Sequence, residues 1–195
     1  MSPVPTYPVP AVVLKSPWRS LWPCVMALAL ASCLLPAAAQ DNRVQEYQLK
    51  AVFLSRFPSF VTWPDNAFAD ASTPIAIGIL GDDPFGGYLR EAIKGEAING
   101  RALVIRRCRN AQDAADCQIV FLAIGDEAKL AEALAALADK PVLTVGEHSA
   151  FTRLGGVIGF VLFDNRIHLE ISTSAATRAQ LTIGAKLMSI ATVVK

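Results

Sequence analysis

The sequence has few of the residues, and none of the motifs, on which common catalytic sites are built. Its 195 residues include two histidines, His148 and His168. The nucleophile motif G-x-S-x-G, the zinc motif H-E-x-x-H and a lysine-bearing phosphate loop are all missing from it. His168 lies on the polar face of a predicted strand, together with Arg166 and Glu170. We interpret it as a solvated or hydrogen-bonded side chain. We therefore predict that the protein is not an enzyme and uses no cofactor.

The sequence also has almost no excess of positive over negative charge. Charged residues make up 18% of the sequence, and the formal net charge is +1. Basic residues cluster only in the segment Arg106-Arg107-Cys108-Arg109, which contains no aromatic side chain. Because nucleic-acid-binding domains present a basic surface, we exclude nucleic acid as a partner. We interpret this segment as the solvated end of a strand.

Cysteine is limited to four residues, of which only Cys108 and Cys117 lie beyond the first 40. In an oxidising compartment these two thiols could form one disulfide. Consecutive parallel strands would instead place them at opposite ends of a sheet, too far apart for a bridge. A disulfide and two separate thiols therefore both stay open. Neither cysteine has a further ligand at metal-binding spacing, so no metal site is expected.

The first 39 residues have the pattern of an export signal. Lys15 and Arg19 precede an apolar stretch over residues 21–36, and three alanines end at position 39. This pattern predicts a signal peptide over residues 1–39 and a mature chain in the bacterial periplasm. The apolar stretch is interrupted by proline and is shorter than the roughly 20 residues that span a bilayer.

A lipid anchor is the alternative to simple export. The sequence Leu-Ala-Ser-Cys at residues 30–33 resembles a bacterial lipobox, in which Cys33 would be lipidated and become the mature N-terminus. The apolar residues directly after Cys33 and the alanine cleavage site favour simple export instead. We expect the mature chain to begin at Gln40.

The mature chain alternates short apolar runs with helical patterns. A run such as residues 75–80, bounded by turn residues, is typical of a strand buried on both faces. Residues 130–137 carry leucines at helical spacing, in a helix that Asp126 would cap. This alternation predicts one Rossmann-like α/β domain over residues 40–195 with a largely parallel sheet. The four strands predicted for that sheet are residues 75–80, 102–106, 118–124 and 141–145.

The last third of the chain changes character. Residues 157–163 and 166–171 flank the pair Asp164-Asn165, and both of these residues tolerate a positive φ. This arrangement predicts a β-hairpin with a two-residue turn. Residues 181–194 have apolar side chains at helical spacing, which predicts a helix that closes the domain.

Aromatic residues are concentrated after the first predicted helix. Apolar side chains recur at helical spacing over residues 44–57, and Pro58 is expected to bend or end that helix. Phe57, Phe60 and Trp63 exceed what one helical stripe requires. Two interpretations stay open: they belong to the ordinary core, or they are exposed anchors for a protein partner.

The segment Gly81-Asp82-Asp83-Pro84 has the outline of a phosphate-binding loop. Its two carboxylates would repel a phosphate, and Pro84 lacks the N–H group that such a loop donates. Asp83 followed by Pro84 is typical of a helix N-cap with proline at the first helical position. We interpret this turn as a helix start and predict no nucleotide binding there.

Three loops follow three of the predicted parallel strands. Such loops meet at the carboxyl edge of a sheet, where α/β proteins bind small ligands. The sequence therefore predicts a candidate ligand crevice at this edge. Its candidate lining residues are Asp82, Asp83, Phe85, Asp126 and His148.

Five segments occur in a recognisable order along the mature chain. They read YQLKAVFLSRFPSFVTWP, IGILGDDPFG, CQIVFLAIGDEAKL, PVLTVGEHSAFTRLGGVIGFVLFDNRIHLEIS and KLMSIATVV. Together, from Tyr47 to Val194, they resemble the YfiR-like family of secreted bacterial proteins. The resemblance covers nearly all of the predicted mature chain.

This resemblance implies a periplasmic α/β domain without known catalysis. The best-understood members bind the periplasmic sensory domain of an inner-membrane diguanylate cyclase and hold the cyclase inactive. Cyclic di-GMP output, and with it biofilm behaviour, then depends on release of that repressor. Other members are encoded beside histidine kinases or outer-membrane transport genes, so the type of partner varies within the family.

Two functions follow from these observations. The first is a periplasmic repressor that binds a membrane signalling enzyme, most simply a diguanylate cyclase, through the aromatic residues Phe57, Phe60 and Trp63. The alternative is a small-ligand sensing module that uses the predicted crevice and acts with a sensor kinase or a transporter. A homodimer is compatible with either function.

Overall fold

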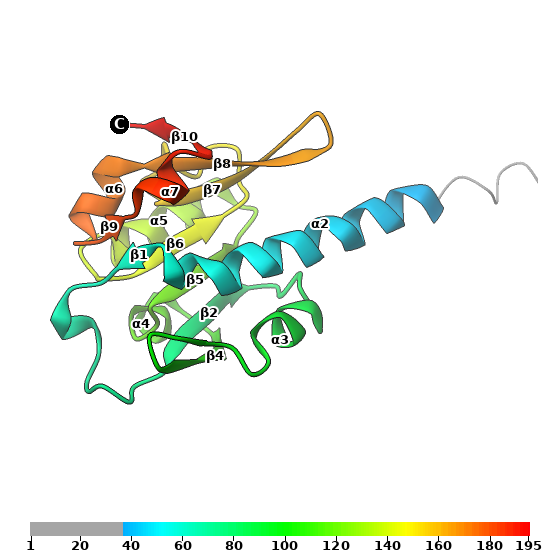
Figure 1. Ribbon diagram of the computed structural model, residues 1–195. Helices are drawn as coiled ribbons and strands as arrows, with labels where there is room; N and C mark the ends of the chain where they lie inside the picture. The colour runs from blue at the N-terminus through cyan, green and yellow to red at the C-terminus, as the bar shows by residue number, and fades with distance from the viewer. Residues whose placement is uncertain (1–36) are drawn as a thin grey trace, which may run out of the picture. The chain divides into compact units, whose positions relative to one another are not determined.

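A computed structural model describes residues 37–195 of the chain (Figure 1). The predicted signal peptide over residues 1–39 lies outside this range except for its last three residues, and Cys33 lies outside it as well. Residues 43–195 form one compact unit. Among the described helices, none is both long enough and apolar enough to cross a membrane.

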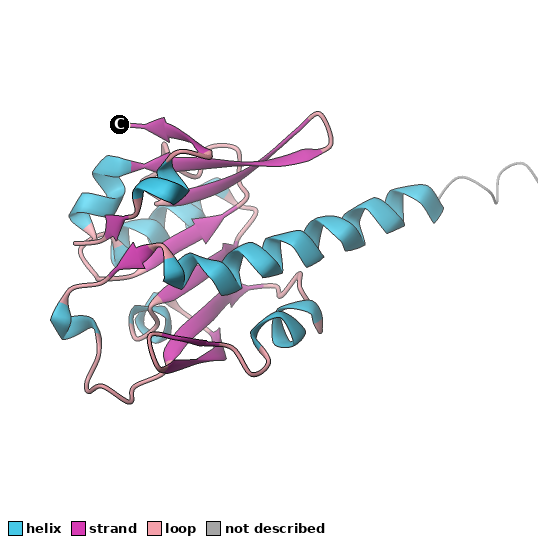
Figure 2. Ribbon diagram, in the orientation of Figure 1, coloured by secondary structure: helices cyan, strands magenta, loops and turns pink. Residues whose placement is uncertain are grey.

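The unit is organised around an eight-stranded sheet with the order β10-β8-β7-β6-β5-β2-β4-β3 (Figures 1 and 2). The neighbouring strands from β7 to β4 are all parallel, whereas β8 is antiparallel to β7. The predicted α/β class with a largely parallel sheet and a C-terminal hairpin is therefore confirmed. The strands are β2 (Ile75–Gly81), β3 (Ala97–Ile98), β4 (Arg101–Cys108), β5 (Ile119–Ala123), β6 (Leu143–Gly146), β7 (Ile158–Phe163), β8 (Arg166–Ser172) and β10 (Ala191–Val194).

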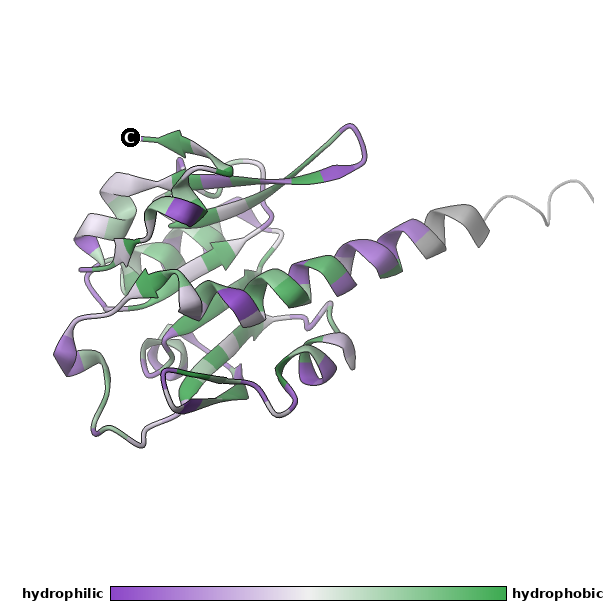
Figure 3. Ribbon diagram, in the orientation of Figure 1, coloured by the Kyte–Doolittle hydropathy of each residue, from purple (hydrophilic) through white to green (hydrophobic). Residues whose placement is uncertain are grey.

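Both faces of the sheet are covered, because its central strands are apolar on both sides. In β5, Ile119 and Phe121 belong to one buried cluster, while Val120 and Leu122 belong to the other. The first cluster contains residues of α2 (Ala37–Arg56), α3 (Tyr88–Ile93), α6 (Thr173–Arg178) and α7 (Ala185–Met188). The second contains residues of α4 (Ala111–Ala115) and α5 (Glu127–Leu137). Figure 3 shows the apolar central strands between more polar outer segments.

Helix α2 ends where the sequence predicts. It stops at Arg56, and Phe57–Ser59 continue as a short 3-10 helix, η2, with Pro58 in its first turn. Proline lacks the N–H group that an α-helix would require at this point. A second short turn, η3 (Asp65–Ala67), then leads into the sheet.

The end of the chain differs from its prediction. Residues 181–194 form not one closing helix but β9 (Thr182–Ile183), the four-residue helix α7 and β10. Strand β9 pairs with β1 (Val61–Thr62) in a separate two-stranded sheet, and β10 adds to β8 over residues 169–172. The β-branched residues Thr192, Val193 and Val194 favour a strand, and this pairing outweighs the helical spacing of the apolar residues.

The turns of the hairpin and of α5 agree with the sequence. Asp164 and Asn165 have φ angles of 49° and 55°, as a two-residue hairpin turn requires. The side chain of Asp126 accepts a hydrogen bond from the backbone N–H of Lys129 and so caps α5. Both predictions are confirmed.

The glycine turn after β2 is not the helix start that its sequence indicates. Asp83 Oδ1 accepts a hydrogen bond from the backbone N–H of Phe85 (2.9 Å), but α3 begins only at Tyr88, after Gly87. The carboxylate therefore closes a local turn. Gly81 has a φ of +102°, and a Cβ there would lie 2.3 Å from the carbonyl oxygen of Ala123. Glycine is thus required at position 81 by the close approach of β5.

Candidate functional site

A hollow lies at the carboxyl ends of β2, β5 and β6. These strands are neighbours and parallel, so the loops that follow them meet at one edge of the sheet. The loops enclose a cavity of about 320 Å³. The residues that line this crevice are Asp82, Pro84, Leu122, Ala123, Ile124, Gly125, Glu147 and His148.

Two of the five predicted crevice residues, Asp82 and His148, line this cavity. Asp83 points to Arg107, whose Nη2 lies 3.0 Å from its Oδ2. Phe85 is buried beneath the loops with its ring centroid 4.8 Å from that of Phe121. Asp126 is used as the cap of α5. The structure therefore brings together the loops that the sequence predicts but only part of their side chains.

Glu147 connects the rim of the crevice to helix α2. Its Oε1 accepts a hydrogen bond from the hydroxyl of Tyr47 (3.0 Å), and its Oε2 accepts one from Lys50 Nζ. Lys50 also donates to Glu46, one turn earlier on α2. The Lys50 ammonium lies 4.7 Å from the centroid of the Tyr47 ring and 5.8 Å from that of Phe160. We call Glu46, Tyr47, Lys50 and Glu147 the lysine cluster.

The lysine cluster holds one cation among two carboxylates with little water. The side chain of Lys50 is only 4% exposed. Burial by itself lowers the pKa of Lys50, but its hydrogen bonds to Glu147 and Glu46 and their negative charges outweigh burial, and the pKa is raised. Burial also raises the pKa of Tyr47, as do the charge and the hydrogen bond of Glu147. The folded protein therefore keeps both groups protonated more firmly than the unfolded chain does.

This protonation predicts a loss of stability in alkaline solution. Groups with raised pKa values contribute stability that is fully present below their unfolded pKa values, about 10 for tyrosine and lysine, and is lost as the pH rises through the folded values. Urea unfolding followed by circular dichroism between pH 8 and pH 11.5 should show the unfolding free energy falling above about pH 10. The Tyr47→Phe, Lys50→Met double variant should show a shallower fall. Equal slopes for the two proteins would contradict this role of the cluster.

A sequence comparison then identifies the family. The profile of the YfiR/HmsC-like family matches residues 47–192, which is most of the chain and includes Tyr47, Lys50 and Glu147. The chain belongs to the YfiR/HmsC-like family. This family is known for periplasmic regulation of cyclic di-GMP cyclases and is regulatory rather than catalytic.

Other comparisons of this YfiR/HmsC-like chain are more distant. No curated protein sequence matches it significantly. A crystal structure of a conserved domain protein from Vibrio cholerae O1 biovar El Tor is 14% identical, with a TM-score of 0.45 over 62% of this chain. The ABC domain in complex with L-Trp from Streptococcus pneumoniae is 13% identical, with a TM-score of 0.44 over 76% of this chain. The alignments span 54% and 60% of those two chains, respectively.

Of the three aromatic residues after α2, Phe57 is a core residue in this YfiR/HmsC-like domain. It is 1% exposed, and its ring stacks on Phe160 with centroids 6.1 Å apart. Of the two interpretations of Phe57, the exposed anchor is therefore wrong and the core residue is correct, because the turn after α2 directs its side chain into the sheet. Phe60 and Trp63 are half-buried, and Trp63 Nε1 donates to the carbonyl oxygen of Gln118 (3.2 Å).

Large exposed apolar side chains occur at other places of the YfiR/HmsC-like domain. Leu49 and Val52 are about half exposed on α2. Leu162 and Phe163 lie at the end of β7, next to the hairpin turn, and Phe163 is 71% exposed. Successive side chains of a strand point to opposite faces of the sheet. Because Leu162 and Phe163 are both exposed, both faces of the hairpin are exposed to solvent at this end. The further exposed apolar residues are Tyr88, Val161, Ile190 and Val193.

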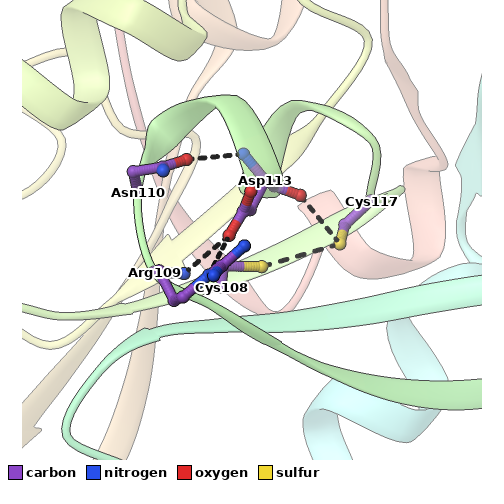
Figure 4. Close-up of polar contacts among 5 residues, drawn as sticks. All are labelled: Cys108, Arg109, Asn110, Asp113 and Cys117. Carbon is purple, nitrogen blue, oxygen red and sulfur yellow. Dashed lines mark hydrogen bonds and ion pairs between the residues drawn. The ribbon is translucent and has the colours of Figure 1, made fainter.

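The two cysteines of the YfiR/HmsC-like domain lie close together. Their Sγ atoms are 3.9 Å apart, and both side chains are buried (Figure 4). The expectation that parallel strands would hold them too far apart for contact is wrong. Cys108 pairs with Leu80 near the end of β2, and Gln118, the neighbour of Cys117, bonds to Ala76 near its start. The side chains of both cysteines nevertheless reach Gly78, which lies between these two levels.

Proposed function

We propose that this protein is a periplasmic repressor that binds the periplasmic sensory domain of a membrane signalling enzyme, most simply a diguanylate cyclase. The observation that carries the proposal is the family match over residues 47–192. The predicted signal peptide supports the same compartment. The lack of a recognisable catalytic motif in the sequence fits a protein that acts by binding.

The exposed apolar residues suggest where the partner binds. A protein interface needs large apolar side chains that become buried in the complex, surrounded by a polar rim. Leu49 and Val52 of α2, with Leu162 and Phe163 of the hairpin, have this character, whereas Phe57 does not. Phe60 and Trp63 retain partial exposure and belong to the same proposal as secondary contacts. We propose Leu49, Val52, Leu162 and Phe163 as the primary contacts.

The lysine cluster connects α2, which carries Leu49 and Val52, to the rim of the crevice. Leu49 is adjacent to Lys50 on α2, and Lys50 is bonded to Glu147 on the crevice rim. A molecule that enters the crevice and engages Glu147 would compete with Lys50 and Tyr47 for its two oxygens. The contacts between α2 and the loop after β6 would then weaken, and the orientation of Leu49 and Val52 would change. Binding of a ligand at Glu147 would in this way cause release of the partner.

A repressor of this kind makes a testable prediction. Deletion of its gene should raise cyclic di-GMP, and the purified mature protein should bind the sensory domain of the cyclase encoded beside it. Phe163→Asp should weaken that binding at least thirtyfold, corresponding to about 2 kcal/mol, if Phe163 is a hot spot. Its melting temperature should stay within a few degrees, because the side chain has little contact to lose. Calorimetric titration and thermal melting measure the two effects.

Two further variants control this experiment. Tyr88→Asp replaces an exposed aromatic residue of α3, which packs beside β4 toward the other end of the sheet, and should bind normally. Phe57→Ala should melt far lower, because truncating a buried phenylalanine costs about 3–5 kcal/mol. Unchanged binding by Phe163→Asp would remove the hairpin from the interface.

Small-ligand sensing is the second candidate function, and the crevice favours it. Its volume of about 320 Å³ is at the lower end of the range of small-molecule sites. Asp82, Glu147 and His148 supply polar groups around an apolar floor. If deletion leaves cyclic di-GMP unchanged and no membrane signalling protein co-purifies, the repressor proposal fails and sensing with a kinase or a transporter takes its place.

A further inference from the structure

Cys108 and Cys117 occupy a buried position on one face of the sheet. Cys108 is the last residue of β4, and Cys117 lies between α4 and β5. Their side chains are 7% and 2% exposed, and the two sulfurs face each other at 3.9 Å (Figure 4). A disulfide requires a sulfur–sulfur distance of about 2.05 Å, so the two sulfurs must come about 2 Å closer to form one.

Gly78 provides the space in which the sulfurs meet. It lies in β2, between the strands that precede and follow the two cysteines. A Cβ atom at this position would lie 2.9 Å from both sulfurs at once. The backbone of Gly78 follows the normal course of the strand, since its φ is not positive. The glycine is therefore explained by the cysteine pair above it and not by a turn.

We infer that Cys108 and Cys117 form a disulfide across Gly78 in the oxidised protein, and that this bridge is a covalent staple of the α4 crossover. The bridge would tie the end of β4 to the start of β5 around the five residues of α4. The inference concerns the domain itself and does not depend on which partner or ligand the protein binds.

The crossover is already shaped for closure without the bridge. Asn110 caps α4 by accepting a hydrogen bond from the backbone N–H of Asp113 (2.8 Å). Arg109 donates to the carboxylate of Asp113 from both its backbone N–H and its Nε, each at 3.2 Å (Figure 4). These contacts hold the chain in a tight turn between the two cysteines. The bridge would therefore add a covalent link to a turn that is already closed by hydrogen bonds.

The reaction needs an oxidant, and a small or protein-borne disulfide is the chemical class that suits it. The thiolate of one cysteine attacks the oxidant's disulfide, which forms a mixed disulfide and releases one thiolate. The second cysteine then loses its proton and attacks the mixed disulfide, which completes the bridge and releases the second thiol. Two electrons and two protons pass from the cysteine pair to the oxidant, which leaves as two thiols.

Burial determines when this exchange takes place. Burial raises the pKa of the Cys117 thiol to about 12, with the neighbouring Cys108 adding to the effect, and burial also raises the pKa of Cys108. The reactive thiolate is therefore rare in the folded, reduced protein. Oxidation is expected during folding or when the α4 crossover opens, and slowly otherwise.

The test uses the full mature protein equilibrated in a series of reduced and oxidised glutathione mixtures. Each sample is quenched with acid, denatured and treated with an alkylating reagent, and the labelled thiols are counted by mass spectrometry. We expect two labelled cysteines under reducing conditions and none under oxidising conditions. Oxidised protein should melt roughly 5–10 °C above the reduced protein, from the loop entropy of about nine residues. The Cys108→Ser, Cys117→Ser double variant should lose this difference.

The role of Gly78 is tested with Gly78→Ala. Its added methyl group should displace the sulfurs, so that a mixture that fully oxidises the wild type leaves a substantial fraction of the variant reduced. Gly87→Ala is the matched control, because a Cβ at Gly87 meets no described atom within 4 Å. Two labelled cysteines in protein equilibrated with excess oxidised glutathione after unfolding and refolding would overturn the inference. An unchanged redox equilibrium in Gly78→Ala would overturn the role of Gly78.

Discussion

Replacement of Lys50 by methionine is expected to lower the free energy of unfolding by about 3 kcal/mol or more. The substitution keeps the length of the side chain but removes the cation between Glu46 and Glu147. Two carboxylates then face each other in a position where the lysine side chain was only 4% exposed. The melting temperature should fall by roughly 6–12 °C for a domain of this size.

Two comparisons make this prediction specific to the lysine cluster. Lys94→Met breaks an ion pair with Glu91 whose side chains are both about three-quarters exposed, and it should cost less than about 1 kcal/mol. The triple variant Lys50→Met, Glu46→Gln, Glu147→Gln removes the charges together and should regain part of the loss. Urea and thermal unfolding measure all three proteins. A Lys50→Met variant that melts like Lys94→Met would show that the cluster does not stabilise the fold.

Replacement of Gly146 by alanine is expected to have the second large effect. Gly146 ends β6, one residue before Glu147, and a Cβ there would lie 2.2 Å from a ring carbon of Phe151. On the other edge of the same ring, a Cβ at Gly156 would lie 2.1 Å away. Phe151 is 1% exposed, and its ring lies between these two glycines. The clash should cost about 1–3 kcal/mol or more.

A smaller side chain at position 151 tests whether the ring is the cause. In Gly146→Ala, Phe151→Leu the two losses should be less than additive, because the leucine makes room for the new methyl group. Gly125→Ala is the control from the same crevice, since a Cβ there meets no described atom within 4 Å, and its stability should change by less than about 0.5 kcal/mol. Unfolding in urea at neutral pH is the measurement. Equal stabilities of the Gly146→Ala and Gly125→Ala variants would contradict the packing argument.

The central strands could be predicted because their signal is local. Residues 75–80 and 118–124 are apolar runs between turn residues, and they correspond to β2 and β5, which are covered on both faces. The hairpin turn at Asp164-Asn165 and the cap at Asp126 were also predictable, since one or two side chains determine each. Loop convergence at the carboxyl edge followed from parallel strand order alone.

The lysine cluster could not be predicted, because it depends on a contact between residues 97 positions apart. The sequence did contain a partial signal, since Glu46 and Lys50 have the i, i+4 spacing of a helical ion pair. Lys50 also lies beside Ala51 on the apolar side of α2, where a lysine needs a buried partner. Nothing local, however, identifies Glu147 as that partner.

Tertiary contacts also explain two of the errors. Residues 181–194 have helical apolar spacing, but β10 finds a partner in β8 that only the folded sheet provides. The cysteines were expected to lie apart because one parallel strand ends, and the next begins, at opposite edges of a sheet. Their side chains instead meet at Gly78, in the middle of β2.

The incomplete pairing of β8 bears on how the protein behaves at high concentration. Strand β10 covers β8 only over residues 169–172. Within the described part of the chain, residues 166–168 therefore pair with β7 on one edge and have no neighbouring strand on the other. An open edge of this kind is a template on which another extended chain can add, and the exposed Leu162 and Phe163 beside it would strengthen such a contact. Arg166 places a charge on the exposed edge itself, and like charges would meet if two hairpins of this protein paired in the same way. We therefore expect Arg166 to disfavour self-association of this protein through the open edge of β8.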